Sequence, residues 1–215
     1  MTRFRHGNLP MKILLTERFK EALVFAFDLH KKQLRKGPAT LPYFPHLMSV
    51  SALVVENGGD ENQAIAGLLH DAIEDQAISY GGADKLRKEI KKRFGERVLE
   101  IVNACTDAES IPKPPWRERK KAYIDSIAHE PEYARLVSLA DKVHNARAIL
   151  SDYRVFGESV WERFAGKKEG SLWYYRSLAD IFYEKLSNQL SNELREIVEV
   201  LEAEVAKSHR RVVST

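Results

Sequence analysis

The chain holds 215 residues, 44% of them hydrophobic and 30% charged, which suits one folded domain, alone or with an appended pair of helices. The 34 basic and 31 acidic residues leave a formal net charge of only +3, and this near balance argues against a nucleic-acid binder, which needs a strongly basic face. No run approaches the roughly 18 apolar residues of a membrane span or forms a secretory core, so we expect a cytoplasmic protein that does not enter the membrane.

The first predicted elements are an irregular lead-in and two helices. Residues 1–15 form the lead-in, and Thr16 is a candidate N-cap for the first helix. Glycine and proline residues mark a loop over residues 36–45. A second helix is expected over residues 46–57, and the Gly58-Gly59 pair ends it.

A third helix is expected to begin after Asp60, because Gln63 follows that residue at capping-box spacing. Its apolar face continues to Ala72, so the pair His70-Asp71 is predicted to lie near the end of this buried helix.

The rest of the chain also has helical periodicity. Helical patterns occupy residues 83–94, 97–106, 117–129, 132–150, 159–164, 172–186 and 191–207, and almost no segment alternates with period two. These patterns predict an all-α fold, a compact multi-helix bundle. We assign the bundle to residues 16–187, and a C-terminal helix and tail to residues 188–215.

The string Leu68-Leu69-His70-Asp71-Ala72-Ile73-Glu74-Asp75 carries the clearest chemical signal. Burying an imidazole or a carboxylate without partners costs several kcal/mol, so such residues after an apolar run are normally paired or metal-bound. On one helix, His70 and Asp71 would point about 100° apart and could converge on a single ion. Glu74 and Asp75 lie four residues further on, so each would stack one turn along the same direction and stand beside the ion without binding it.

Two further positions strengthen the metal interpretation. His46 stands at the start of the second predicted helix, and Asp141 interrupts the apolar run Leu136-Val137-Ser138-Leu139-Ala140. Taken alone, the His70-Asp71 pair is explained equally well as a salt-bridged or capping pair at a helix end. The four residues together favour a metal site.

Five strings, taken in order, resemble the HD superfamily, and within it the hydrolase domain of RelA/SpoT proteins and the stand-alone small alarmone hydrolases. The superfamily pattern is a His, then a His-Asp pair, then a distant Asp. The strings lie between Ala22 and about Tyr175, and they are Gln33-Leu34-Arg35-Lys36, Leu41-Pro42-Tyr43-Phe44-Pro45-His46, Gly67-Leu68-Leu69-His70-Asp71-Ala72-Ile73-Glu74-Asp75, Phe94-Gly95-Glu96-Arg97-Val98 and Leu139-Ala140-Asp141-Lys142-Val143-His144-Asn145.

The resemblance implies a site for one divalent ion, usually Mn²⁺, with Fe²⁺ or Co²⁺ as alternatives. His46, His70, Asp71 and Asp141 match the family's metal ligands. Two nitrogen and two oxygen ligands leave open octahedral positions for water and a phosphate oxygen, which suits Mn²⁺ or Fe²⁺ better than a closed zinc site.

The resemblance also implies roles around the metal. Glu74 and Asp75 match the acidic pair that positions or deprotonates the attacking water. The residues that match contacts to a nucleotide substrate are Arg35, Lys36, Asn145 and Tyr174. The implied reaction is hydrolysis of guanosine tetra- or pentaphosphate at the 3′ position, with release of pyrophosphate.

The chain departs from the family pattern at three places. Leu47 replaces the common proline after the first metal His, Ala148 replaces a hydroxyl or acidic residue, and residues 166–173 differ throughout. Because these differences bear on guanine recognition, two alternatives stay open: a phosphatase for another nucleotide or a phosphorylated dinucleotide, and a non-catalytic, metal-stabilised nucleotide-binding module. The oligomeric state is not predicted.

Overall fold

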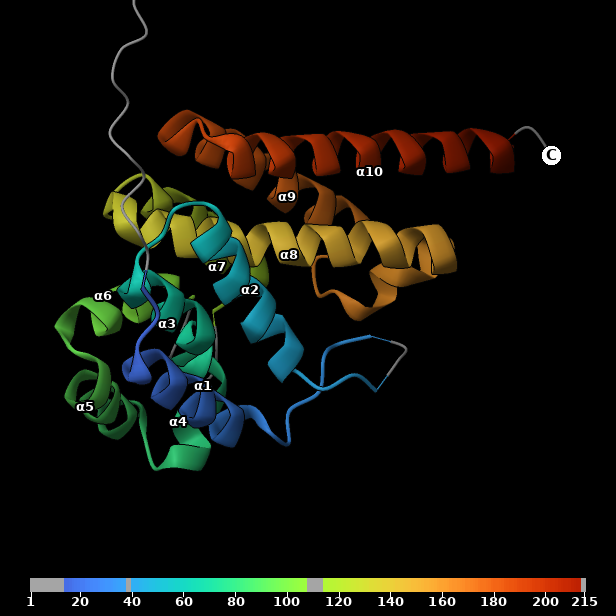
Figure 1. Cartoon of the computed structure of the whole chain (residues 1–215). Helices are drawn as coiled ribbons and strands as arrows, with labels where there is room; N and C mark the ends of the chain where they lie inside the picture. The colour runs from blue at the N-terminus through green and yellow to red at the C-terminus, as the bar shows by residue number, and fades with distance from the viewer. Residues whose placement is uncertain (1–13, 38–39, 108–113, 214–215) are drawn as a thin grey trace, which may run out of the picture.

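Helices account for nearly all the regular structure in a computed structural model that describes residues 14–37, 40–107 and 114–213 (Figure 1). Within these residues no strand occurs, and one isolated β-bridge joins Leu34 to Pro42. The elements are α1 (Glu17–His30), α2 (Phe44–Glu56), α3 (Glu61–Leu69), α4 (Ala72–Tyr80), α5 (Ala83–Phe94), α6 (Glu96–Cys105), α7 (Trp116–Ile127), α8 (Glu132–Phe156), the 3₁₀-helix η1 (Gly157–Arg163), α9 (Lys167–Leu186) and α10 (Gln189–Val213). The all-α prediction is confirmed.

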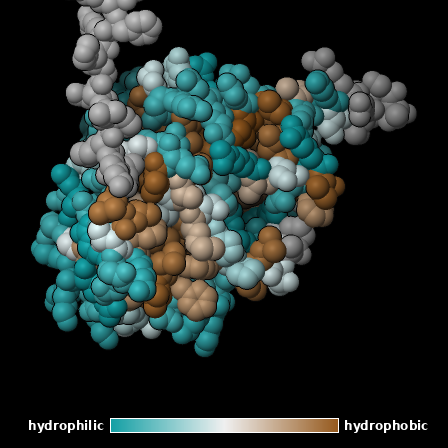
Figure 2. Space-filling model, in the orientation of Figure 1, coloured by the Kyte–Doolittle hydropathy of each residue, from teal (hydrophilic) through white to brown (hydrophobic). Residues whose placement is uncertain are grey.

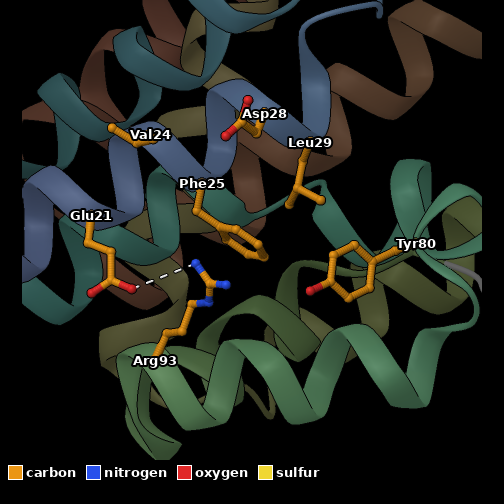
Figure 3. A pocket seen from close by; sticks show the side chains of 7 residues that line it. All are labelled: Glu21, Val24, Phe25, Asp28, Leu29, Tyr80 and Arg93. Carbon is orange, nitrogen blue, oxygen red and sulfur yellow. Dashed lines mark ion pairs between the residues drawn. The ribbon is translucent and has the colours of Figure 1, made fainter.

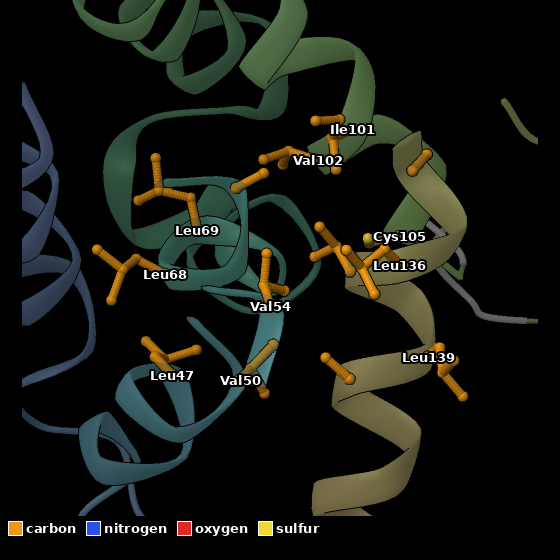
Figure 4. Close-up of a cluster of buried hydrophobic side chains, with 14 of the residues drawn as sticks. Leu47, Val50, Val54, Leu68, Leu69, Ile101, Val102, Cys105, Leu136 and Leu139 are labelled. Atoms are coloured by element: carbon orange, nitrogen blue, oxygen red, sulfur yellow. The ribbon is translucent and has the colours of Figure 1, made fainter. Parts of the chain in front are cut away.

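Helix α8 is the axis of the bundle, since α2, α3, α6, α9 and α10 all pack against it. Figure 4 shows apolar side chains of α2, α3, α6 and α8 meeting in one core. Those labelled and fully buried include Leu47, Val50, Leu68, Ile101 and Leu139. Each such side chain stabilises the fold by about 1.5–3 kcal/mol. The core therefore fixes the three helices that carry the predicted metal ligands.

A close crossing of α2 and α3 brings their ends together. A Cβ atom on Gly67 would lie 3.0 Å from the Cα atom of Ser51, so only glycine permits this approach without a shift of backbone. The Ser51 hydroxyl donates a hydrogen bond of 2.8 Å to the carbonyl of Ala64, which pins the same contact. His46 and His70 lie on these two tightly packed segments.

The two predicted helix N-caps agree with the structure, whereas the second helix begins at Phe44, two residues before the predicted start. The Thr16 side chain accepts from the amide of Arg18, and Asp60 and Gln63 form the predicted capping box in both directions. Such caps satisfy amides that the first helical turn leaves without partners, at about 1 kcal/mol each.

The prediction of one continuous third helix that includes Ala72 is wrong. Helix α3 ends at Leu69, His70 is its C-cap, and Asp71 leaves helical geometry at φ −96° and ψ 1° before α4 begins. The break redirects the chain so that the His70 side chain and the N-terminal end of α4 both reach the interior. Periodicity alone continues through such a junction, because both short helices are apolar on the buried side.

Smaller differences concern the later elements. Residues 157–163 are 3₁₀-helical, not α-helical, and α9 begins at Lys167. Helix α10 lies along α8 and α9 (Figure 1), where Leu194, Val198 and Leu201 are buried. None of the described helices combines the length and the apolar character needed to cross a bilayer.

Candidate metal centre and surrounding site

The four predicted ligands converge where α2, the α3–α4 junction and α8 meet. The Nε2 atom of His46 lies 3.3 Å from Asp141 Oδ1 and 3.7 Å from Asp71 Oδ2. The Nε2 atom of His70 lies 2.9 Å from Asp71 Oδ2 and 3.6 Å from Asp141 Oδ1. Ligand atoms of His46, His70 and Asp141 all lie within 4.8 Å of one another. One small cation can therefore bind between these groups.

The two histidines present their Nε2 atoms to this point. Both Nε2 atoms are buried, and apart from the nearby carboxylates of Asp71 and Asp141 they have no hydrogen-bond partner among the described residues. His70 Nδ1 lies 2.9 Å from the carbonyl of Gly67, so it carries the proton and donates it. Because Nδ1 keeps its proton, loss of the Nε2 proton would leave a lone pair on Nε2, which is the form that binds a metal.

The carboxylates of the site accept hydrogen bonds from the start of α2 and from α8. Asp71 accepts from the Tyr43 hydroxyl. Asp141 accepts from Lys142 Nζ at 2.6 Å and from Asn145 Nδ2 at 2.5 Å. Burial opposes ionisation of Asp141, but Lys142 and the two imidazoles outweigh it and hold its pKa well below the usual value. The carboxylates are thus ionised and ready to bind a cation.

Neighbouring charges and burial also shift the pKa values of the imidazoles. Burial alone would lower the pKa of His70, but Asp71 and Asp141 outweigh burial and raise that pKa well above the ordinary value. The pKa of His144, by contrast, is lowered to about 4, mainly by burial and then by His46 and Arg35. His144 is therefore neutral near pH 7.

Two of the predicted nucleotide contacts lie together beside the metal ligands. Arg35 donates from Nη2 to Asn145 Oδ1 at 2.9 Å, and Asn145 itself bonds Asp141. The Arg35 guanidinium also lies 5.6 Å from the centre of the Tyr43 ring. Lys36 is exposed next to residues 38–39, which lie outside the described part. Tyr174 is buried in α9, and Lys120 lies 4.9 Å from its ring centre.

The predicted acidic pair lies in the first turn of α4. Glu74 is half-buried and Asp75 is exposed. The backbone amide of Asp75 donates to the carbonyl of Asp71 at 2.9 Å, so one helical turn joins the pair to the metal ligands. Gln33 Nε2 donates to Asp75 Oδ2 at 2.7 Å.

Sequence reasoning assigned no role to Tyr43, Lys142 or Gln33. Tyr43 stands three residues before His46, a spacing that places both on one side of a helix start, and this could have indicated it. His144, three residues after Asp141, follows the same rule. The ion pair of adjacent Lys142 and Asp141 has no such signal, because neighbours on a helix point about 100° apart.

A comparison with protein families decides what kind of domain holds this geometry. A family model described as HD domain matches residues 22–170, more than half of the chain. The chain belongs to the HD domain family. The matched range includes all four candidate ligands, and Tyr174 lies just beyond it.

Individual relatives of this HD domain are named as hydrolases. The chain is 37% identical over 129 residues to guanosine-3′,5′-bis(diphosphate) 3′-pyrophosphohydrolase MESH1 of Xenopus tropicalis, over 59% of this chain and 66% of the relative. It is 35% identical to MESH1 of Drosophila melanogaster, over 60% of this chain and 68% of the relative. The match thus spans about two thirds of these proteins.

A solved structure shares the fold more fully. It is described as a metazoan ortholog of SpoT that hydrolyses ppGpp and plays a role in starvation responses. Its TM-score to this chain is 0.71 at 28% identity, and the similarity covers 87% of this chain and 97% of that one.

The donor set of this HD domain fits a divalent cation. The two buried Nε2 atoms face two ionised carboxylates, and of these carboxylates only Asp141 has a lysine partner, Lys142, among the described residues. Histidine with carboxylate donors and open positions is typical of Mn²⁺ or Fe²⁺ sites.

The contact between His46 and His144 yields a prediction about metal affinity. Their Nδ1 atoms lie 2.8 Å apart, so one must donate and the other accept. If His46 binds metal through Nε2, its Nδ1 carries the proton and His144 accepts it. His144→Ala is then expected to weaken Mn²⁺ affinity by about 10- to 100-fold, measured by titration against a fluorescent chelator.

His144→Asn is the matched variant, because its amide oxygen can take the place of the accepting Nδ1 atom. It should keep most of the affinity. If Asn weakens binding as much as Ala, the imidazole ring matters and the hydrogen bond does not.

The divergent segment 166–173 has a structural explanation in this HD domain. Cβ atoms on Gly166 and Gly170 would lie 2.5 Å and 3.0 Å from the Trp116 ring, so the two glycines form the surface on which that indole packs. Trp116 also contacts Trp173 and Tyr174 edge-on, at centroid distances of 6.3 and 6.2 Å. The segment thus carries an aromatic cluster joining α7 to α9.

A surface pocket lies elsewhere, between α1, the end of α4 and α5 (Figure 3). Its volume is about 370 Å³, and it is lined by Glu21, Val24, Phe25, Asp28, Leu29, Tyr80 and Arg93. Figure 2 shows apolar groups among the hydrophilic residues of one face, and Val24 and Phe27 of α1 are among the exposed large apolar side chains. None of the predicted site residues lines this pocket, so the pocket is separate from the candidate metal centre.

Proposed function

We propose that this HD domain is a metal-dependent hydrolase that cleaves guanosine 3′,5′-bis(diphosphate) at the 3′ position and releases pyrophosphate. The observation that carries the proposal is the pair of buried Nε2 atoms of His46 and His70, which face the carboxylates of Asp71 and Asp141. The names of the relatives and the fold shared with the SpoT ortholog support the substrate.

We propose His46, His70, Asp71 and Asp141 as the ligands, and Mn²⁺ as the ion. When bound, the ion would polarise a phosphate oxygen and lower the pKa of water. Tyr43, Lys142 and Asn145 hold the carboxylates in place.

Glu74 and Asp75 would orient the attacking water and take its proton, from the first turn of α4. The nucleotide would be bound by Arg35, Lys36 and Asn145. The planar guanidinium of Arg35 can donate two parallel hydrogen bonds to one phosphate. Tyr174 would line the nucleotide site from α9, where it is buried with Lys120 over its ring.

The Arg35 and Lys36 assignment yields a kinetic prediction. Replacing both with alanine is expected to raise KM for the preferred nucleotide by about 10-fold or more while kcat changes less, because phosphate contacts similar in ground and transition states contribute to uniform binding. Steady-state kinetics measures this. Lys31→Ala with Lys32→Ala, two exposed positions of the same region, is the matched control. An unchanged KM in the first double variant would assign Arg35 and Lys36 to the solvated surface.

A second candidate function is hydrolysis of a different nucleotide or of a phosphorylated dinucleotide. The cluster of Trp116 on Gly166 and Gly170 favours it, because this segment differs from the hydrolases that the chain resembles. Ala148, which lacks the polar side chain common at that position, points the same way.

The purified protein with Mn²⁺, assayed against a panel of nucleotides, tests both candidates. Pyrophosphate release from guanosine 3′,5′-bis(diphosphate), with GDP as the other product, supports the first. Faster release of orthophosphate from another nucleotide supports the second. Binding without turnover of any nucleotide would contradict both and leave a binding module.

A further inference from the structure

We infer that Gln33, held by His30 and Gln76, positions the Asp75 carboxylate for its part in the hydrolysis proposed above, on which this role rests. Gln33 follows α1, and Asp75 and Gln76 lie on α4, so the contact joins elements far apart in the chain. We define the Gln33 clamp as Gln33 with its three partners His30, Asp75 and Gln76.

The hydrogen bonds of the clamp determine how the Gln33 amide is oriented. His30 Nδ1 lies 2.7 Å from Gln33 Oε1, and Gln76 Nε2 donates to the same oxygen at 2.5 Å. Gln33 Nε2 then faces Asp75 Oδ2 at 2.7 Å. A flipped amide would place its oxygen against a carboxylate oxygen and its NH₂ against that of Gln76, so only the observed orientation satisfies all three contacts.

His30 supplies the rigid end of the clamp. Its side chain is only 1% exposed, and it ends α1. Burial lowers the pKa of His30 and so favours the neutral ring. The Nδ1 atom of this ring donates its proton to Gln33 Oε1. A buried donor in a fixed rotamer holds its acceptor more firmly than a solvent-exposed side chain could.

The same ring also supports the metal ligands. His30 stacks on Tyr43, at a centroid distance of 5.6 Å and an interplanar angle of 18°, and the Tyr43 hydroxyl donates to Asp71. His30 therefore contacts Asp75 indirectly, by its hydrogen bond to Gln33, and contacts Asp71 indirectly, by its stacking on Tyr43. The two carboxylates lie one helical turn apart, and this arrangement couples the position of Asp75 to the metal centre.

The chemical effect follows from the exposure of Asp75. An exposed aspartate normally samples several rotamers, but the bond from Gln33 engages Oδ2 and fixes the direction in which Oδ1 points. A general base contributes to the rate only when it lies within hydrogen-bond reach of the water it deprotonates. Gln33 acts through Asp75, so it is a positioning residue.

Gln33→Glu tests the inference, because it keeps the oxygen that accepts from His30 and Gln76 and replaces only the donor to Asp75. We expect kcat to fall by about 10- to 100-fold, the range caused by small misplacements of a reacting group. KM and Mn²⁺ affinity should change by less than about twofold, because neither the nucleotide contacts nor the ligands are altered. Gln189→Glu, an exposed position at the start of α10, makes the same chemical change and should leave kcat as in the wild type.

A double-mutant cycle with Asp75→Asn shows whether Gln33 acts through Asp75. In Gln33→Glu with Asp75→Asn the donor and acceptor are exchanged, so the contact is restored while the base is absent. The midpoint of thermal unfolding should fall in Gln33→Glu and be regained in the double variant. The residual kcat of Asp75→Asn should fall no further on adding Gln33→Glu.

Three results would overturn the inference: a wild-type kcat in Gln33→Glu, an equal loss of kcat in both backgrounds, or no regain of the midpoint. If the wild type hydrolyses no nucleotide at all, the proposed function fails by itself. The thermal cycle then decides the clamp, since regain of the midpoint supports the contact and additive losses contradict it.

Discussion

His70→Ala is expected to abolish binding of the divalent ion and to reduce nucleotide hydrolysis to background. The imidazole contributes one of the two buried Nε2 donors, and nothing else described in the site can replace it. Mn²⁺ at about 100 times its Kd should stabilise the wild type by about 2.7 kcal/mol. For a chain of this size, that is a rise in the unfolding midpoint of about 5 to 10 °C, and His70→Ala should show no such rise.

The metal-free variant should also be less stable than the metal-free wild type. Without the ion, His70 balances Asp71 and Asp141, and removing one member of a buried charged group costs about 3–5 kcal/mol. His129→Ala is the matched control, because His129 is exposed after α7 and should keep both metal and activity. Elemental analysis and calorimetry with and without Mn²⁺ provide the measurements. If His70→Ala still binds one ion per chain with the wild-type rise in midpoint, the ligand assignment is wrong.

Local sequence signals were sufficient to predict most helix starts. The side chains of Asp60 and Gln63 each accept a hydrogen bond from the backbone amide of the other residue. Because both residues lie within four positions, this signal does not depend on the rest of the fold. Helix α5 has the predicted bounds because it is amphipathic and Gly95 ends it in the left-handed region at φ 89°. The order of all-helical elements followed from periodicity, and the family resemblance supplied their arrangement.

The break between α3 and α4 could not be predicted in this way. His70 and Asp71 continue the helical pattern of apolar neighbours, and neither glycine nor proline marks the junction. At this turn the side chains of His70 and Asp71 reach His46 and Asp141, which lie on other helices. Tertiary contacts thus decide a boundary where local propensity favours continuation.

The supporting residues of the site were also beyond sequence reasoning. Gln33 reaches Asp75 across 42 positions, and Arg35 reaches Asn145 across 110. Spacing rules relate only residues within one or two turns, so they identify ligands on one helix and miss donors that arrive from another. The resemblance brought Arg35 and Asn145 to the same pocket, and the structure adds the hydrogen bond between them.

Glu74→Gln and Asp75→Asn separate catalysis from binding. Each substitution keeps the shape of the side chain and removes the proton acceptor, so each is expected to lower kcat by about 10²–10⁴, the usual contribution of a positioned general base. Both residues lie in the first turn of α4, one turn beyond Asp71, and neither is among the four proposed ligands. Mn²⁺ content and KM should therefore stay near the wild-type values.

The two variants should also differ from each other. Asp75 is exposed and bonded to Gln33, so its amide replacement should leave the unfolding midpoint nearly unchanged, whereas Glu74 is half-buried and its replacement should shift the midpoint more. Asp125→Asn, an exposed acid of α7, controls for the loss of one negative charge. Loss of the metal in either variant would make that residue a ligand or an essential support of one. A wild-type kcat in both would remove the acidic pair from the mechanism and leave the attacking water to be oriented by the metal and its ligands alone.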